Sequence, residues 1–252
     1  MSEHAISIPT PDGSADGFLV RPTADERAAP GVILLTDIIG IRDAAHTFAQ
    51  RLADQGYVVL MPNVFYRSAR PPLWTFKFDF SDERTVKRFS ELMGPLQPEA
   101  IERDASAYVD FLAAQPGVKE GPMGIAGYCA TGGVALRMAA ARPDRLAAVA
   151  SFHGGGLCTD APKSPHLVLP RVKARLYFAH AHQDRSMPQA AIDRLVEALA
   201  AWGGEYDSEV YEGAGHGWTQ TDAGVYNAAA ADRAFGKLTE LFAQTLSSQE
   251  LT

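Results

Sequence analysis

Residues 123–133 read MGIAGYCATGG, an apolar run that breaks into small residues around a single cysteine, Cys129. The first six residues have the length and composition of a buried strand, and the segment 131–145 that follows resembles a helix. Small residues such as Gly127 and Gly132 let the backbone turn sharply and present a side chain between the two elements. A free cysteine is also often simply packed in a core. The stretch therefore predicts a strand, a tight turn and a helix, with Cys129 either a nucleophile or a core residue.

Short apolar runs alternate with longer amphipathic segments along the rest of the chain. Strands are predicted at residues 31–37, 57–62, 122–128, 146–154, 174–180 and 206–213, and helices at 43–56, 81–93, 98–117, 131–145 and 187–204. This alternation is typical of a mostly parallel central sheet with helices on both faces, so we expect an α/β fold. Residues 65–97 are rich in Arg, Pro and aromatic residues and fit the alternation least well, which predicts an excursion over the site.

Composition restricts the expected partners. The 252 residues include 46% hydrophobic ones and carry a net charge of -7 at pH 7. Because phosphate binding depends on clustered positive charge, we expect a small soluble ligand rather than nucleic acid or an acidic membrane surface. The chain shows no signal-peptide pattern and no apolar run near the roughly 18 residues of a membrane span, which predicts a cytoplasmic protein. Cys129 and Cys158 should then be free thiols.

Two further candidate catalytic groups follow later predicted strands. Asp184 lies after the strand at 174–180, and His216 lies in a glycine-flanked loop after the strand at 206–213. The carboxyl ends of parallel strands meet at one edge of a sheet, where ligands bind. The order of nucleophile, acid and histidine is that of α/β-hydrolases. We therefore predict that Cys129 attacks, His216 acts as the base and Asp184 orients His216.

The motifs GYCATGG, HQD and GAGHGW, with LLTDIIGI and YVVLMPNVFYR upstream, resemble those of the dienelactone hydrolase (carboxymethylenebutenolidase) family. The likeness runs from about Gly17 to about Ala243. It implies a single α/β-hydrolase domain over residues 1–252 that hydrolyses lactone or carboxylic ester bonds through an acyl-cysteine. It also implies that no metal or organic cofactor takes part. By the same resemblance, the backbone amides of Ile38 and Ala130 form the oxyanion hole.

The resemblance also gives Asp37 a possible role beside the resting thiol. Family members commonly carry a carboxylate after the third strand, usually glutamate, and it contacts the cysteine. A neighbouring carboxylate raises the pKa of a thiol, which keeps it neutral and slows its oxidation. Asp37 is one methylene shorter than glutamate, and it can instead end the strand and cap the following turn. Both roles remain open from the sequence.

Two departures from the family pattern bear on the substrate. Members acting on dienelactone hold its carboxylate with arginines, one of them shortly after the catalytic histidine. Here GWTQTDAG follows His216, without an arginine, so we expect a less charged or more aromatic substrate. Thr131 stands where the family commonly has glycine two places after the nucleophile, and we expect it to narrow the space around Cys129.

Several other residues are candidates for contact with substrate. Trp218 and Tyr128 have apolar rings next to the histidine and the cysteine, although Tyr128 can equally fill the core. His153 falls at a strand end and can be either a substrate contact or a structural histidine. Candidate anion holders in the excursion, each of which can also be a solvated surface charge, are Arg67, Arg70, Arg84 and Arg88.

Two other functions are compatible with the sequence. His180, His182 and Asp184 resemble the start of an H-x-H-x-D zinc signature, which would give a zinc-dependent hydrolase, although Arg185 stands where that signature needs another histidine. The fold could also serve a non-catalytic protein that binds a ligand or senses oxidants through its thiol. We expect a monomer or a small homo-oligomer.

Overall fold

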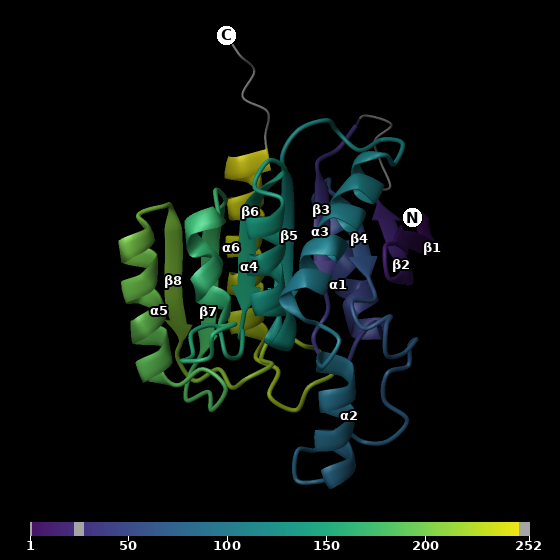
Figure 1. Ribbon diagram of the computed structural model, residues 1–252. Coiled ribbons are helices and arrows are strands. Elements are labelled where there is room, and N and C mark those ends of the chain that lie inside the picture. The colour runs from purple at the N-terminus through teal and green to yellow at the C-terminus, as the bar shows by residue number, and fades with distance from the viewer. Residues whose placement is uncertain (1, 23–27, 247–252) are drawn as a thin grey trace.

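The computed structural model describes residues 2–22 and 28–246 and centres on an eight-stranded sheet (Figure 1). The strands lie in the order β1-β2-β4-β3-β5-β6-β7-β8. β2 pairs antiparallel with both β1 and β4, and the remaining neighbours are parallel. The strand bounds are β1 (Ser2–Thr10), β2 (Gly13–Arg21), β3 (Gly31–Leu35), β4 (Val58–Pro62), β5 (Met123–Tyr128), β6 (Leu146–Phe152), β7 (Arg175–Ala181) and β8 (Tyr206–Tyr211).

Helices cover both faces of the sheet. On one face, α1 (Asp43–Asp54) and α6 (Ala228–Leu246) enclose a core that includes Leu52 and Phe242. On the other face, α3 (Pro98–Ala113), α4 (Gly132–Ala141) and α5 (Gln189–Trp202) enclose a second core. The central strands β3, β4 and β5 are buried along their whole length, because both of their faces are covered. This arrangement confirms the predicted α/β class.

The excursion predicted at residues 65–97 contains α2 (Glu83–Met93). Figure 1 shows α2 beyond the end of the sheet toward which β8 points, which is the carboxyl end of the parallel strands. The segment before α2 reaches the turn after β3, where the Trp74 Nε1 donates to the carbonyl of Ile38 at 2.9 Å. Residues of the excursion therefore lie next to the predicted site.

Three features of the fold were not predicted or were placed differently. The hairpin of β1 and β2 and the helix α6 were not predicted. β3 ends at Leu35, two residues earlier than expected, because Asp37 bends the chain into a turn through a bond from the Ile39 amide at 2.9 Å. Within the described ranges, none of the helices is long and apolar enough to span a bilayer.

Candidate active site

Cys129 lies at a strained turn directly after β5. Its φ angle is 56°, in the left-handed region that side chains other than glycine seldom occupy. A single 3-10 turn, η1 (Cys129–Thr131), and then α4 follow at once. Two glycines allow this geometry, since a Cβ on Gly127 would overlap the Thr131 carbonyl and one on Gly132 would overlap the Ser151 hydroxyl. The turn lifts the partly exposed Cys129 out of the sheet.

His216 lies between the thiol and Asp184. Its Nε2 is 3.1 Å from the Cys129 Sγ, and its Nδ1 is 2.6 Å from the Asp184 Oδ2. The other oxygen of Asp184 accepts bonds from the amide and hydroxyl of Ser186, at 2.8 and 2.7 Å. Because an ionised carboxylate only accepts, Nδ1 is the donor to Asp184, and Nε2 is left facing the sulfur. The three residues come from the loops after β5, β7 and β8.

Electrostatic interactions favour the charged forms of both Asp184 and His216. Burial raises the pKa of Asp184, but the hydrogen bonds from His216 and Ser186 outweigh it and hold the pKa below its usual value. Burial likewise lowers the pKa of His216, but its bonds with Asp184 and Cys129 outweigh that effect and raise the pKa to about 10. The arrangement can accept a proton from the thiol and keep the resulting imidazolium paired.

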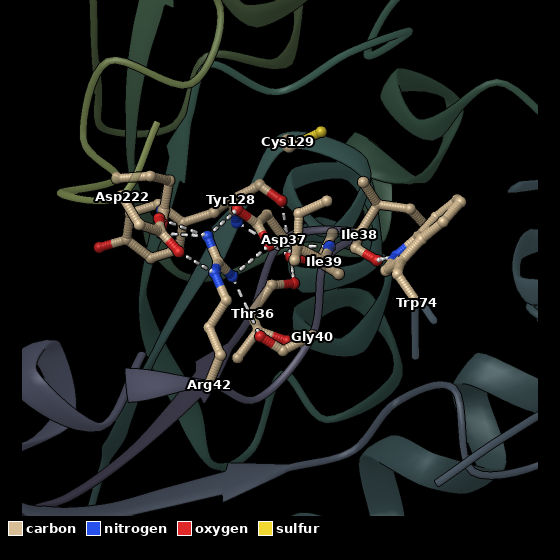
Figure 2. A network of polar contacts seen from close by, with 12 residues as sticks. Thr36, Asp37, Ile38, Ile39, Gly40, Arg42, Trp74, Tyr128, Cys129 and Asp222 are labelled. Atoms are coloured by element: carbon tan, nitrogen blue, oxygen red, sulfur yellow. Dashed lines mark hydrogen bonds and ion pairs between the residues drawn. The ribbon is translucent and has the colours of Figure 1, made fainter. Parts of the chain in front are cut away.

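Asp37 lies in the turn after β3 (Figure 2). Its two oxygens accept bonds from the Arg42 guanidinium, at 2.8 and 3.0 Å, and one also accepts from the amide of Ile39. In the part of the chain that the structure describes, Asp37 makes no hydrogen bond with Cys129, whose sulfur instead contacts His216. The structure therefore shows Asp37 in the turn-capping role, because Arg42 is the nearer partner for its charge.

Among residues 2–22 and 28–246, the amide of Ile38 makes no backbone hydrogen bond outside the helices and strands, and the amide of Ala130 makes none outside its own 3-10 turn. Ile38 lies in the turn after β3, and Ala130 directly follows the nucleophile candidate. β3 and β5 are neighbours in parallel register, with Leu35 opposite Gly127, so the two segments leave the sheet side by side. A role of the two amides as oxyanion donors stays a prediction.

Thr131 has a role that sequence reasoning missed. Its hydroxyl accepts from the Tyr128 amide at 2.9 Å and lies 2.9 Å from the Thr36 carbonyl and 3.3 Å from the Leu35 carbonyl. The residue is fully buried. The expectation that Thr131 narrows the space around Cys129 is not what the contacts show, because the hydroxyl points to the backbone under the elbow. It joins the ends of β3 and β5.

Comparison with known proteins identifies the family. The model of the dienelactone hydrolase family matches residues 15–246. The chain belongs to the dienelactone hydrolase family. A Salmonella typhi protein named "Putative carboxymethylenebutenolidase" is 28% identical over 246 residues, which are 97% of this chain and 88% of that protein. A carboxymethylenebutenolidase of Pseudomonas putida is 29% identical over 232 residues, which are 92% of each chain.

Solved structures agree on the fold of this dienelactone hydrolase family member. One from Klebsiella pneumoniae subsp. pneumoniae, named "Putative Dienelactone Hydrolase", has a TM-score of 0.85 at 22% identity. The match covers 96% of this chain and 98% of that one. The fold is therefore the α/β-hydrolase fold predicted from the motifs, and the protein is a hydrolase.

The residues predicted to contact substrate lie in different environments in this family member. Trp218 and Tyr128 are buried, with 0% and 3% of their surface exposed, so Tyr128 fills the core behind the elbow. His153 is also buried, and its ring centroid lies 5.2 Å from those of His216 and Trp218. Burial lowers the pKa of His153 well below its usual value, and the neutral ring bonds the Thr219 hydroxyl at 2.8 Å. The ring of His153 therefore packs against His216, and that of Trp218 packs against His153 in turn.

The arginines of the excursion have protein partners. Arg84 is exposed and pairs with Asp82 at 2.6 Å, and Arg88 donates to the Leu73 carbonyl at 3.1 Å. Arg67 pairs with Asp12 and Asp104, and Arg70 pairs with Asp16. Contact of any of them with substrate stays a prediction.

The three residues of the zinc alternative do not converge. His180 is buried and its Nε2 lies 3.0 Å from the Ser208 hydroxyl, whereas His182 pairs with Glu212 at 2.7 Å. Asp184 faces His216 instead. The described part of the chain holds no group of three or more His, Cys, Asp or Glu side chains placed to bind one metal ion. His180, His182 and Asp184 therefore do not form the zinc site considered from the sequence.

Proposed function

We propose that this hydrolase cleaves small lactones or carboxylic esters through Cys129, His216 and Asp184, with a transient acyl-cysteine. The observation that carries the proposal is the 3.1 Å contact between the His216 Nε2 and the Cys129 Sγ at a strained elbow, with Asp184 bound behind the imidazole. The names of the related proteins from Salmonella typhi and Pseudomonas putida, as carboxymethylenebutenolidases, point to the same bond type.

In the first half-reaction, His216 already holds the thiol proton, and the thiolate of Cys129 attacks the carbonyl carbon. The carbonyl oxygen becomes negative and accepts hydrogen bonds from the amides of Ile38 and Ala130. The tetrahedral intermediate then collapses, the bond between carbon and the ester oxygen breaks, and the leaving oxygen takes the proton from His216. The acyl group is left on Cys129 as a thioester.

In the second half-reaction, His216 takes a proton from water, whose oxygen attacks the thioester carbonyl. Breakdown of this intermediate releases the acid and returns the proton to the Cys129 sulfur. Asp184 keeps Nδ1 protonated throughout and stabilises the imidazolium that forms in each half-reaction. The proposal needs only groups that lie in the four loops after β3, β5, β7 and β8.

An apolar or aromatic substrate suits the surroundings of the proposed oxyanion hole. Trp74 bonds the carbonyl of Ile38, and its ring centroid lies 4.8 Å from that of Phe78. Phe78 in turn contacts Phe80, which is 59% exposed. The exposed ring of Phe80 and the partly buried rings of Trp74 and Phe78 can pack against an apolar acyl or aryl group of a substrate.

Steady-state hydrolysis of a chromogenic short-chain aryl ester tests the proposal. We expect turnover that Cys129→Ala abolishes and His216→Ala nearly abolishes, because no other group replaces the nucleophile or the base. Cys158→Ala is the matched control, since Cys158 is a buried thiol and burial raises its pKa. Full activity in Cys129→Ala would refute the mechanism. A thiol that oxidises reversibly but gives no turnover would instead favour the redox-sensing alternative.

A panel of lactones, aryl esters, alkyl esters, thioesters and amides would define the substrate class. Cys129→Ser belongs beside the wild type, because a serine at the elbow keeps the geometry but has a much less acidic nucleophile. We expect amides to be the poorest substrates.

A further inference from the structure

One guanidinium group connects two loops of the site (Figure 2). Arg42 donates from Nη1 and Nη2 to the two oxygens of Asp37, at 2.8 and 3.0 Å, and from Nη1 to the Gly40 carbonyl at 3.1 Å. On its other side, Nε and Nη2 donate to the Asp222 carboxylate at 2.6 and 3.1 Å. Nη2 also lies 3.2 Å from the Gln220 Oε1. Asp37 and Gly40 belong to the turn after β3, and the other two residues belong to the loop that carries the proposed base.

The shape of the turn after β3 depends on the charge that Arg42 binds. The amide of Ile39 donates to the Asp37 carboxylate at 2.9 Å, and the amide of Gly40 donates to the Asp37 carbonyl at 3.0 Å. Only 8% of the Asp37 side chain is exposed, and a buried carboxylate is costly without a partner. Without Arg42, the Asp37 carboxylate would have to bind water or another donor. Its movement would shift the neighbouring amide of Ile38.

We propose that Arg42 is a positioning residue that fixes the Ile38 amide relative to His216 by tying the two loops together. The inference rests on the proposed function, because it takes Ile38 as an oxyanion donor. Helix α1 does not require this side chain. Arg42 is the N-cap residue, and its backbone carbonyl accepts the amides of Ala45 and His46, while its side chain makes no capping bond. Substitution of the side chain therefore leaves the helix start in place.

The geometry suits arginine rather than lysine. A planar guanidinium can present two parallel N–H groups to one carboxylate and still use Nε toward a second, whereas an ammonium is a point charge without that fork. Arg42 lies between a carboxylate that is 8% exposed and one, Asp222, that is 47% exposed. Bidentate geometry on both sides fixes the relative orientation of the loops as well as their separation.

Comparison of two reactions of the same thiol separates positioning from a general structural effect. Ester hydrolysis needs the oxyanion donors, whereas alkylation of Cys129 by iodoacetamide is a displacement at carbon that forms no oxyanion. For Arg42→Gln we expect the kcat for the aryl ester to fall about 30-fold, because a slightly misplaced oxyanion donor costs much of its effect. The alkylation rate should stay within about 3-fold of wild type, because the Cys129 and His216 pair is intact.

Arg51→Gln is the matched control. Arg51 lies on the same helix and also pairs with a distant carboxylate, that of Asp232 on α6, at 3.0 Å. The Arg51→Gln enzyme should keep the wild-type kcat for the aryl ester. An Arg42→Gln enzyme as active as Arg51→Gln would overturn the inference. A parallel loss of alkylation and hydrolysis would overturn it too, because the effect would then run through the thiol and its base.

Chemical rescue keeps the inference testable if the first variant folds poorly. Arg42 and Asp222 line a surface cavity of about 670 Å³ together with Pro71 and Pro72, so a small cation can reach the position of the missing group. Guanidinium chloride at non-denaturing concentration should raise the kcat of Arg42→Ala, whereas the same concentration of sodium chloride should not. Equal effects of the two salts would count against positioning. A wild-type enzyme that shows no ester turnover, or turnover that Cys129→Ala leaves unchanged, would instead refute the proposed function.

Discussion

Replacement of Thr131 by valine should destabilise the protein although it keeps the shape of the side chain. The hydroxyl accepts the amide of Tyr128 and can donate to the carbonyl of Thr36, both at 2.9 Å, in a site with no exposed surface. Valine leaves that donor and that acceptor without a partner. A buried polar group that loses its partner costs about 1–3 kcal/mol, so we expect a loss of about 3 kcal/mol in the free energy of unfolding.

Urea unfolding followed by circular dichroism measures this loss. With an m-value of about 3 kcal/mol/M, the midpoint of Thr131→Val should fall by about 1 M. Thr131→Ser is the matched control because it keeps the hydroxyl and loses only a buried methyl group, which costs about 1 kcal/mol. If the valine variant proves as stable as the serine variant, the hydroxyl does not join the strand ends as argued.

Three further predictions follow from the elbow, the triad and one helix. Gly127→Ala should cost about 3 kcal/mol in thermal or urea unfolding, because its Cβ overlaps a backbone carbonyl, whereas Gly236→Ala in α6 meets open space and should stabilise by about 0.5 kcal/mol; equal effects would contradict the packing argument. Ser186→Ala removes one of the bonds that hold Asp184 and should lower kcat about 10-fold in the ester assay, and an unchanged kcat would show that the remaining amide bond suffices. The pKa of His216 is raised to about 10, so its stabilising contribution is complete below the unfolded value near 6.5 and is lost as the pH rises toward 10. Wild type should therefore lose more stability than His216→Asn between those pH values in urea unfolding, and identical slopes would refute the raised pKa.

The parallel core of the fold could be predicted from the sequence because its strands are short, continuous apolar runs with both faces covered. All six predicted strands are present, within about two residues at their ends. The β1 and β2 hairpin was missed because one face of each strand is solvated, which leaves no continuous apolar run. The composition of residues 65–97 identified the excursion in the sequence but not its position in space. That position depends on contacts such as the hydrogen bond from Trp74 to the Ile38 carbonyl.

At the site, local motifs led to the nucleophile candidate, its histidine and its aspartate, which the structure brings into contact. The partner of Asp37 could not be predicted in the same way. Arg42 is close in sequence, but nothing in the motif indicates that Asp222, in a separate loop, completes the bridge. Likewise, Thr131 was expected to narrow the space around Cys129. The direction of its buried hydroxyl could not be predicted, because it depends on a carbonyl of the segment after β3.

The contacts of Arg42 with Asp222 can form only late in synthesis, because the second residue leaves the ribosome long after the first. Arg42 and Asp222 are 180 positions apart, and Cys129 is 87 positions from His216. Contacts of such long range form slowly, and a domain generally folds as a unit. A nascent chain that ends before His216 would carry the thiol of Cys129 but would lack both its base and the far side of the bridge. Hydrolytic activity would then report completion of the chain, and truncated products would carry a thiol without turnover.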